Sequence, residues 1–90
     1  MMKKFTVIGN LLIVHVAFDG NLDTNDIICE VPPGIGKRLK YLGFTGCYNR
    51  SPYSPIFNVQ FYVQGIYLAI STPGKYTNGE FFAIADLKDI

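Results

Sequence analysis

The chain has 90 residues, enough for a single small domain that we expect to span residues 1–90. Hydrophobic residues make up 49% of it and charged residues only 17%, whereas a typical soluble domain has about 25% charged residues. This shortage of charge favours an oligomer, because a monomer would have few charged side chains to cover its surface. The net charge of +1 and one short basic run, Lys37-Arg38-Leu39-Lys40, argue against a nucleic-acid-binding protein.

The first 18 residues, MMKKFTVIGNLLIVHVAF, have the basic start and apolar stretch of a signal peptide. Asn10 and His15 interrupt the stretch, however, and no small-residue cleavage motif follows it. The alternation of Leu12, Val14 and Val16 is instead typical of a strand. We therefore expect strands at 4–8 and 11–18, no signal peptide and no insertion into a membrane, since the stretch is also too short to span a bilayer.

The strand at 11–18 is apolar on both faces, because Leu11 and Ile13 alternate with the residues just named. The last strand repeats this pattern with Phe82 and Ile84. One face of an antiparallel sheet usually meets water. A strand that is apolar on both faces therefore indicates either a second subunit on one side or a central position in a monomer.

The segment DGNLDTNDIICE, residues 19–30, places oxygen-bearing side chains at a spacing that resembles a calcium loop. Thr24 occupies the position where the sharp turn of such a loop needs glycine, and strands rather than helices flank the segment. We favour an acidic turn between two strands. The following PPGIGKR lacks the spacing of a phosphate-binding loop, and its prolines and glycines are sufficient to end a strand and turn the chain.

The rest of the chain alternates between β-rich runs and turn residues, and no run has the period of a helix. We expect further strands at 27–31, 40–48, 57–63, 66–71 and 80–87. The turns between them include Asp19-Gly20-Asn21 and Asn78-Gly79. The sequence therefore predicts an all-β fold, a small antiparallel β-sandwich or barrel of about six to seven strands.

The stretch VQFYVQGIYLAIS, residues 59–71, predicts a hairpin with Gln64-Gly65 as a two-residue turn. In that register Val63 faces Ile66, and Tyr62 faces Tyr67 on the opposite side of the hairpin. One side of the hairpin is then wholly apolar, and we expect the tyrosine pair on the other side to contact a neighbouring subunit.

Few residues are candidates for catalysis or metal binding. His15 is the single histidine, and its apolar neighbours favour a packed or hydrogen-bonded side chain over a general base. Cys29 and Cys47 have no metal-like spacing and lie in strand-like runs, so we expect buried, reduced thiols. We therefore expect no catalytic residues, no metal and no cofactor.

Six tyrosines with polar neighbours offer apolar surfaces with polar rims, of the kind that bind sugars or other proteins. We expect a saccharide site on the segment that contains Tyr48, Asn49, Arg50 and Tyr53, because loops present binding groups from a rigid scaffold. The expected subunit interface comprises Leu11, Ile13, Tyr62, Tyr67 and Phe82.

The order of these features resembles the C-terminal β-domain of phage tail-fibre and baseplate receptor-binding proteins. The resemblance covers nearly the whole chain and rests on degenerate β motifs, and Lys37-Arg38 stands where that family has a proline after its Pro-x-Gly turn. The segments that carry it are GNLLIVHVAF, the acidic turn, IICEVPPG, GFTGCYN, FNVQFYVQGIYLAIS and GEFFAIADL.

The resemblance implies a homotrimeric, non-enzymatic head that attaches a virion to saccharides of the host cell envelope. Such a protein is made in the host cytoplasm and ends at the tail tip of the virion. The alternative is a small inhibitor or accessory protein, encoded by a mobile element, that binds a protein partner through an exposed apolar sheet face.

Overall fold

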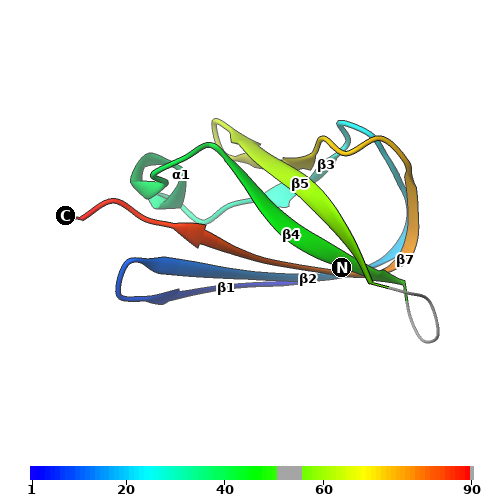
Figure 1. Cartoon of the computed structure of the whole chain (residues 1–90), viewed down its shortest axis with the longest axis horizontal. Coiled ribbons are helices and arrows are strands. Elements are labelled where there is room, and N and C mark those ends of the chain that lie inside the picture. The colour runs from blue at the N-terminus through cyan, green and yellow to red at the C-terminus, as the bar shows by residue number, and fades with distance from the viewer. Residues whose placement is uncertain (51–55, 90) are drawn as a thin grey trace.

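The computed structural model describes residues 1–50 and 56–89 and confirms the all-β fold (Figure 1). One short helix, α1, accompanies seven strands in this part of the chain. Their bounds are β1 Met2–Ile8, β2 Leu11–Asp23, β3 Ile27–Glu30, α1 Ile35–Arg38, β4 Gly43–Arg50, β5 Ile56–Gln64, β6 Tyr67–Ile70 and β7 Lys75–Asp86.

All strand pairs are antiparallel and form one sheet in the order β1-β2-β7-β4-β5-β6-β3, which is nearly closed into a barrel. In Figure 1, β1, β2 and β7 run together along one side, β5 and β3 lie on the other, and α1 covers one end. The edge strands β1 and β3 each pair with one neighbour only.

The core lies inside the barrel and is made mainly by alternate residues of β2, β5 and β7, as the period of two requires, whereas no residue of β1 is fully buried. Phe81 of β7 is at its centre, stacked on Phe18 of β2 with ring centroids 4.9 Å apart. The rings of Phe61 and Tyr48 contact it from β5 and β4, with centroids 5.4 Å away in each case. These contacts join strands from both halves of the barrel.

Strands β2 and β7 are longer than predicted, because the expected turns at Asp19-Gly20-Asn21 and Asn78-Gly79 lie within them. Their register shifts between Phe18 and Asn21, where Gly20 has a φ of 105°. The Gly20 amide donates a hydrogen bond of 2.7 Å to the side-chain oxygen of Asn78. The residues that resemble turns thus form a bulge, which bends the strand pair instead of ending it.

The hairpin of β5 and β6 turns at Gly65-Ile66, one residue later than predicted. Gln64 faces Tyr67 and Val63 faces Leu68. Gly65 has a φ of 63° and is the first of the two turn residues, the position where a type II′ turn requires glycine. The predicted apolar side is correct for Val59, Phe61, Val63, Leu68 and Ile70, which are all buried, but not for Ile66, which is a turn residue and 49% exposed.

The prediction that the chain contains no helix is wrong for Ile35–Arg38, which form a single turn after Pro32-Pro33-Gly34. The amide of Ile35 donates a hydrogen bond of 3.1 Å to the carbonyl of Pro32. A single turn is too short to show the period of a helix in the sequence. The strand expected from residue 40 also begins later, at Gly43.

Candidate functional site

The outward side of β2 and β7 carries an apolar surface that we call the β2–β7 face. Ile13 lies opposite Ile84, and Leu11 precedes Ile13 on the same side of β2. Phe82 lies opposite Cys47 of β4, and a groove of about 440 Å³ runs beside these side chains. Three of the five predicted interface residues, Leu11, Ile13 and Phe82, are therefore on one face.

Three apolar side chains of this face are open to solvent. Leu11 is 42% exposed, Phe82 39% and Ile84 60%, although all three lie on the molecule's longest strand pair, β2 and β7. Contiguous apolar surface of this kind marks an interaction site more often than scattered apolar residues do.

His15 is part of the β2–β7 face and is packed and hydrogen-bonded, as the sequence indicated. Its ring stacks on that of Phe82, with centroids 4.3 Å apart and an angle of 11° between the planes. Its Nε2 lies 3.3 Å from a carboxylate oxygen of Glu80. Lys4 of β1 faces His15 from the other side. Charged groups of both signs thus border the apolar centre of the face.

The other two predicted interface residues, Tyr62 and Tyr67, lie on a separate surface, the outward side of β5, β6 and β3. We call it the hairpin face. Tyr67 lies between Gln64 of β5 and Glu30 of β3. Strands β7 and β4 separate β5 from β2 in the sheet. The five predicted interface residues therefore lie on two separate surfaces.

The two tyrosines also do not face each other as predicted. Because the turn is one residue later, Tyr62 lies opposite Ala69, and Ala69 pairs with Ile27 of β3 on its other side. Tyr62 and Tyr67 are diagonal neighbours on the hairpin face. Sequence reasoning missed Ile27 and Glu30 as members of this surface, because the pairing of β3 with β6 joins segments that are distant in the chain.

The first three residues of the predicted saccharide segment, Tyr48, Asn49 and Arg50, lie in a strand. The strand β4 continues to Arg50, and Tyr48 is only 5% exposed. The Tyr48 hydroxyl donates a hydrogen bond of 2.6 Å to the carbonyl of Thr77. Its ring therefore belongs to the core and is not available to a sugar, which corrects the prediction for this residue.

The remaining residues of that segment do not form a described site. Asn49 is half-buried and lies opposite Glu80, and Arg50 is exposed at the end of β4. Tyr53 lies outside the residues that the structure describes.

The two cysteines are free and half-buried. Burial raises the pKa of the Cys29 thiol, and the nearby Lys3 ammonium opposes that effect. Cys47 lies on the β2–β7 face beside Phe82. Both thiols are thus less buried than the sequence predicted, and their reduced state stays a prediction.

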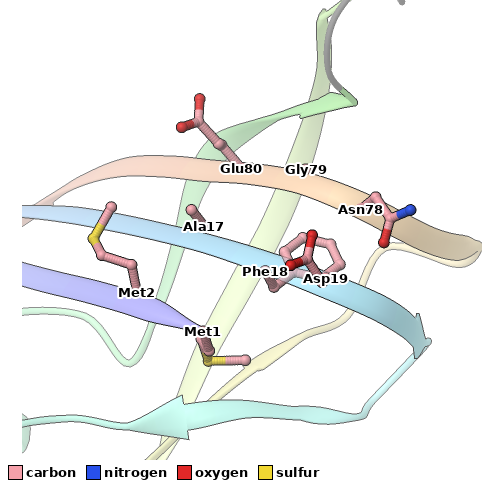
Figure 2. Close-up of a pocket in the computed structure, with 8 residues that line it drawn as sticks. All are labelled: Met1, Met2, Ala17, Phe18, Asp19, Asn78, Gly79 and Glu80. Carbon is pink, nitrogen blue, oxygen red and sulfur yellow. The ribbon is translucent and has the colours of Figure 1, made fainter.

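A second hollow, of about 390 Å³, lies near the start of β1 (Figure 2). Asp19 and Glu80 are its acidic residues, and Figure 2 shows Glu80 pointing to the side of the strand pair opposite Met1. In residues 1–50 and 56–89, no three or more His, Cys, Asp or Glu side chains are grouped so that they could hold a metal ion. No helix in these residues is long and apolar enough to cross a membrane.

The two outward faces are thus the surfaces with the features of binding sites, one apolar with charged borders and the other built on tyrosines and polar side chains. Comparisons of this chain with known proteins found no matching family model, no matching curated protein and no matching solved structure.

Proposed function

We propose that this protein is the receptor-binding head of a phage tail fibre or baseplate. It is a non-enzymatic module that binds saccharides of the host cell envelope as a homotrimer. The resemblance of nearly the whole chain to such heads supports this proposal. The observation that carries it is the β2–β7 face, because an apolar sheet surface in the middle of a small domain favours assembly.

Area and charge both favour a second copy of the chain as the partner of this face. A stable interface takes about 800 Å² from each partner, which is about one-seventh of the 5620 Å² surface of this chain. Lys4 and Glu80 border the face, together with Asp86 at its far end. A border that carries both signs of charge allows two copies of the chain to meet through this face, because positive groups of one copy can lie next to negative groups of the other.

Light scattering of the purified chain tests the assembly. We expect a mass of about 30 kDa, three times the 10.1 kDa of one chain. Ile84→Glu should yield monomers, because it places a charge in the centre of the face. Leu42→Glu is the matched control, since Leu42 is 61% exposed but lies before β4 and outside the face. A wild-type mass of 10 kDa at micromolar concentration would exclude the trimer.

Adsorption to cells tests the receptor-binding role. Fluorescently labelled protein should bind to intact bacteria of at least one strain in a broad panel. Treatment of those cells with periodate, which cleaves the vicinal diols of sugars, should abolish the binding. Binding that survives periodate but is lost after protease treatment of the cells would contradict a saccharide receptor.

The same face also supports a second function, that of a small mobile-element-encoded inhibitor or accessory protein. The groove beside Phe82 and Ile84 would then hold a protein partner rather than another copy. A monomeric wild-type protein that does not bind to any cells would favour this alternative.

A further inference from the structure

We infer that the hairpin face binds one neutral hexopyranose unit, with the ring of Tyr67 as the stacking surface. This inference rests on the proposed function and names the site that carries it out. It assigns Tyr62 and Tyr67 to the ligand, and it leaves subunit contact to the β2–β7 face.

The strand register places polar groups on both sides of the Tyr67 ring. Gln64 faces Tyr67 from β5, and Glu30 faces it from β3. Neighbouring strands are about 4.8 Å apart, so the backbone positions that carry an amide and a carboxylate lie one strand spacing away on either side of Tyr67. A pyranose has an apolar C–H face that can stack on the ring and hydroxyl groups around its edge. These hydroxyl groups can reach both polar side chains.

Two more side chains lie near the Tyr67 ring in the next row of the face. Tyr62 and Ile27 lie on either side of Ala69, which is only 3% exposed and is therefore covered by its neighbours, whereas Ile27 is 56% exposed. Tyr62 and Ile27 thus provide the apolar part of the surface next to Tyr67. A site with aromatic walls and a few well-placed polar groups has the general composition of a small-molecule site.

The hydroxyl groups distinguish these tyrosines from those of the core. Tyr48 and Tyr76 are buried, and their hydroxyls donate to the carbonyls of Thr77 and Thr72, respectively. In residues 1–50 and 56–89, the hydroxyls of Tyr62 and Tyr67 make no hydrogen bond, and their rings stack on no other ring. Buried tyrosines usually bond their hydroxyls, so the outward pair keeps donors that an external partner can use.

The face is also held rigidly from beneath. Leu68 and Ile70 alternate with Tyr67 and Ala69 on β6, and both are buried in the core. The tight turn at Gly65 and the pairing of β6 with both β5 and β3 fix the position of Tyr67. A sugar site on such an element loses little conformational entropy when the ligand binds.

The charge of the face selects the type of sugar. Glu30 is an acidic side chain that lies directly beside Tyr67. Lys3 and Lys4 line a hollow together with Glu30, so charges of both signs lie at this edge and give an anionic sugar such as a sialic acid no net attraction, whereas the Glu30 carboxylate accepts hydrogen bonds from the hydroxyls of a neutral sugar. We therefore commit to a neutral hexopyranose rather than an acidic sugar.

The experiment is a titration of the ¹⁵N-labelled full chain, followed by its amide NMR signals. The probes are methyl α-D-glucopyranoside, methyl β-D-galactopyranoside and N-acetyl-D-glucosamine, with N-acetylneuraminic acid as the anionic comparison. We expect at least one neutral probe to give saturable shifts at Glu30, Gln64 and Tyr67. Tyr67→Ala should weaken that binding at least 10-fold. Tyr41→Ala, at a tyrosine that is 60% exposed but outside this face, should leave it unchanged.

Three results would overturn the inference: no saturable shift with any neutral probe, shifts confined to Asn49 and Arg50, or dissociation of a wild-type trimer by Tyr67→Ala. The last would show that a second copy covers the hairpin face. Light scattering of the same samples separates this inference from the proposed assembly. A monomer that binds sugar at Tyr67 refutes only the trimer, and a trimer without this site refutes only the sugar site.

Discussion

Tyr48 and Thr77 are joined by two hydrogen bonds across 29 residues of chain. The Tyr48 hydroxyl donates to the Thr77 carbonyl at 2.6 Å and accepts from the Thr77 amide at 3.1 Å. The same ring makes an edge contact with Tyr76 at 5.1 Å. One phenol therefore satisfies both backbone groups of a residue at the bend of β7, where the strand has left its regular pairing with β4.

Tyr48→Phe should destabilise the fold while leaving its shape intact. It removes both hydrogen bonds and leaves two backbone groups without their partner, at a cost of about 1–3 kcal/mol in the free energy of unfolding. Urea denaturation measures this cost. Tyr67→Phe is the matched control, because the Tyr67 hydroxyl makes no hydrogen bond within the described residues, and its effect should be close to zero. Equal effects of the two substitutions would contradict this account.

Gly46→Ala should be more destabilising than Gly43→Ala on the same strand. A Cβ atom at Gly46 would lie 2.5 Å from the ring of Phe61 and 2.8 Å from the Cβ of Ala83, whereas at Gly43 the nearest atom is an ordinary 3.6 Å away. Overpacking of this kind costs about 1–3 kcal/mol. Thermal unfolding of both variants compares them directly, and an equally stable Gly46→Ala variant would show that β4 and β7 can separate at no cost.

Stability should fall as the pH rises above about 9. The folded chain has a raised pKa at Cys29, whereas the unfolded chain has the ordinary value of 9.0. Below that value both states keep the proton and stability is unaffected. As the pH rises through 9 towards the folded pKa, only the unfolded state ionises, so the free energy of unfolding decreases.

Cys29→Ala removes this contribution and should flatten the stability profile between pH 8 and pH 10.5. Urea denaturation at a series of pH values tests it. A profile as steep in Cys29→Ala as in the wild type would assign the alkaline loss to another group, such as Tyr76, whose pKa burial also raises.

Assembly should depend on Phe82 and not on Tyr67. Phe82→Ala removes the aromatic centre of the β2–β7 face and also the ring on which His15 stacks. Truncation of an interface aromatic costs about 1–3 kcal/mol, so sedimentation equilibrium should show a weaker trimer. Tyr67→Ala should leave the association constant within a factor of two. If Tyr67→Ala weakens the trimer and Phe82→Ala does not, the hairpin face is the subunit interface and the β2–β7 face is free.

The sequence predicted strands and their buried sides correctly where apolar residues alternate with a period of two. The alternation of Leu12, Val14, Val16 and Phe18 predicted a strand and its buried side, and those four residues are all buried. The same alternation identified the buried side of the hairpin, although the turn is displaced by one residue. Moving a two-residue turn by one position shifts the strand register by two residues, which changes which residues face each other but not which side each occupies, because side chains alternate along each strand.

The pairing of distant segments could not be predicted in this way. Glu30 reaches Tyr67 only because β3 pairs with β6 at the end of the sheet. Tyr48 is buried because β4 pairs with β7, which places its ring inside the barrel against Phe81. Asp19-Gly20-Asn21 has the composition of a turn, yet the bond from Gly20 to Asn78 makes it a bulge. Each outcome depends on a residue far away in the chain.

The two edges of the sheet have a consequence for how copies of this protein can accumulate. β1 and β3 leave one side of their backbones without a strand partner, and such edges are templates for fibre growth. Lys3 and Lys4 place positive charge on β1, while β3 has only four residues and is followed closely by Pro32-Pro33. These features discourage edge-to-edge stacking. Even at high local concentration, copies of the chain should meet through their faces and form closed particles instead of growing into amyloid.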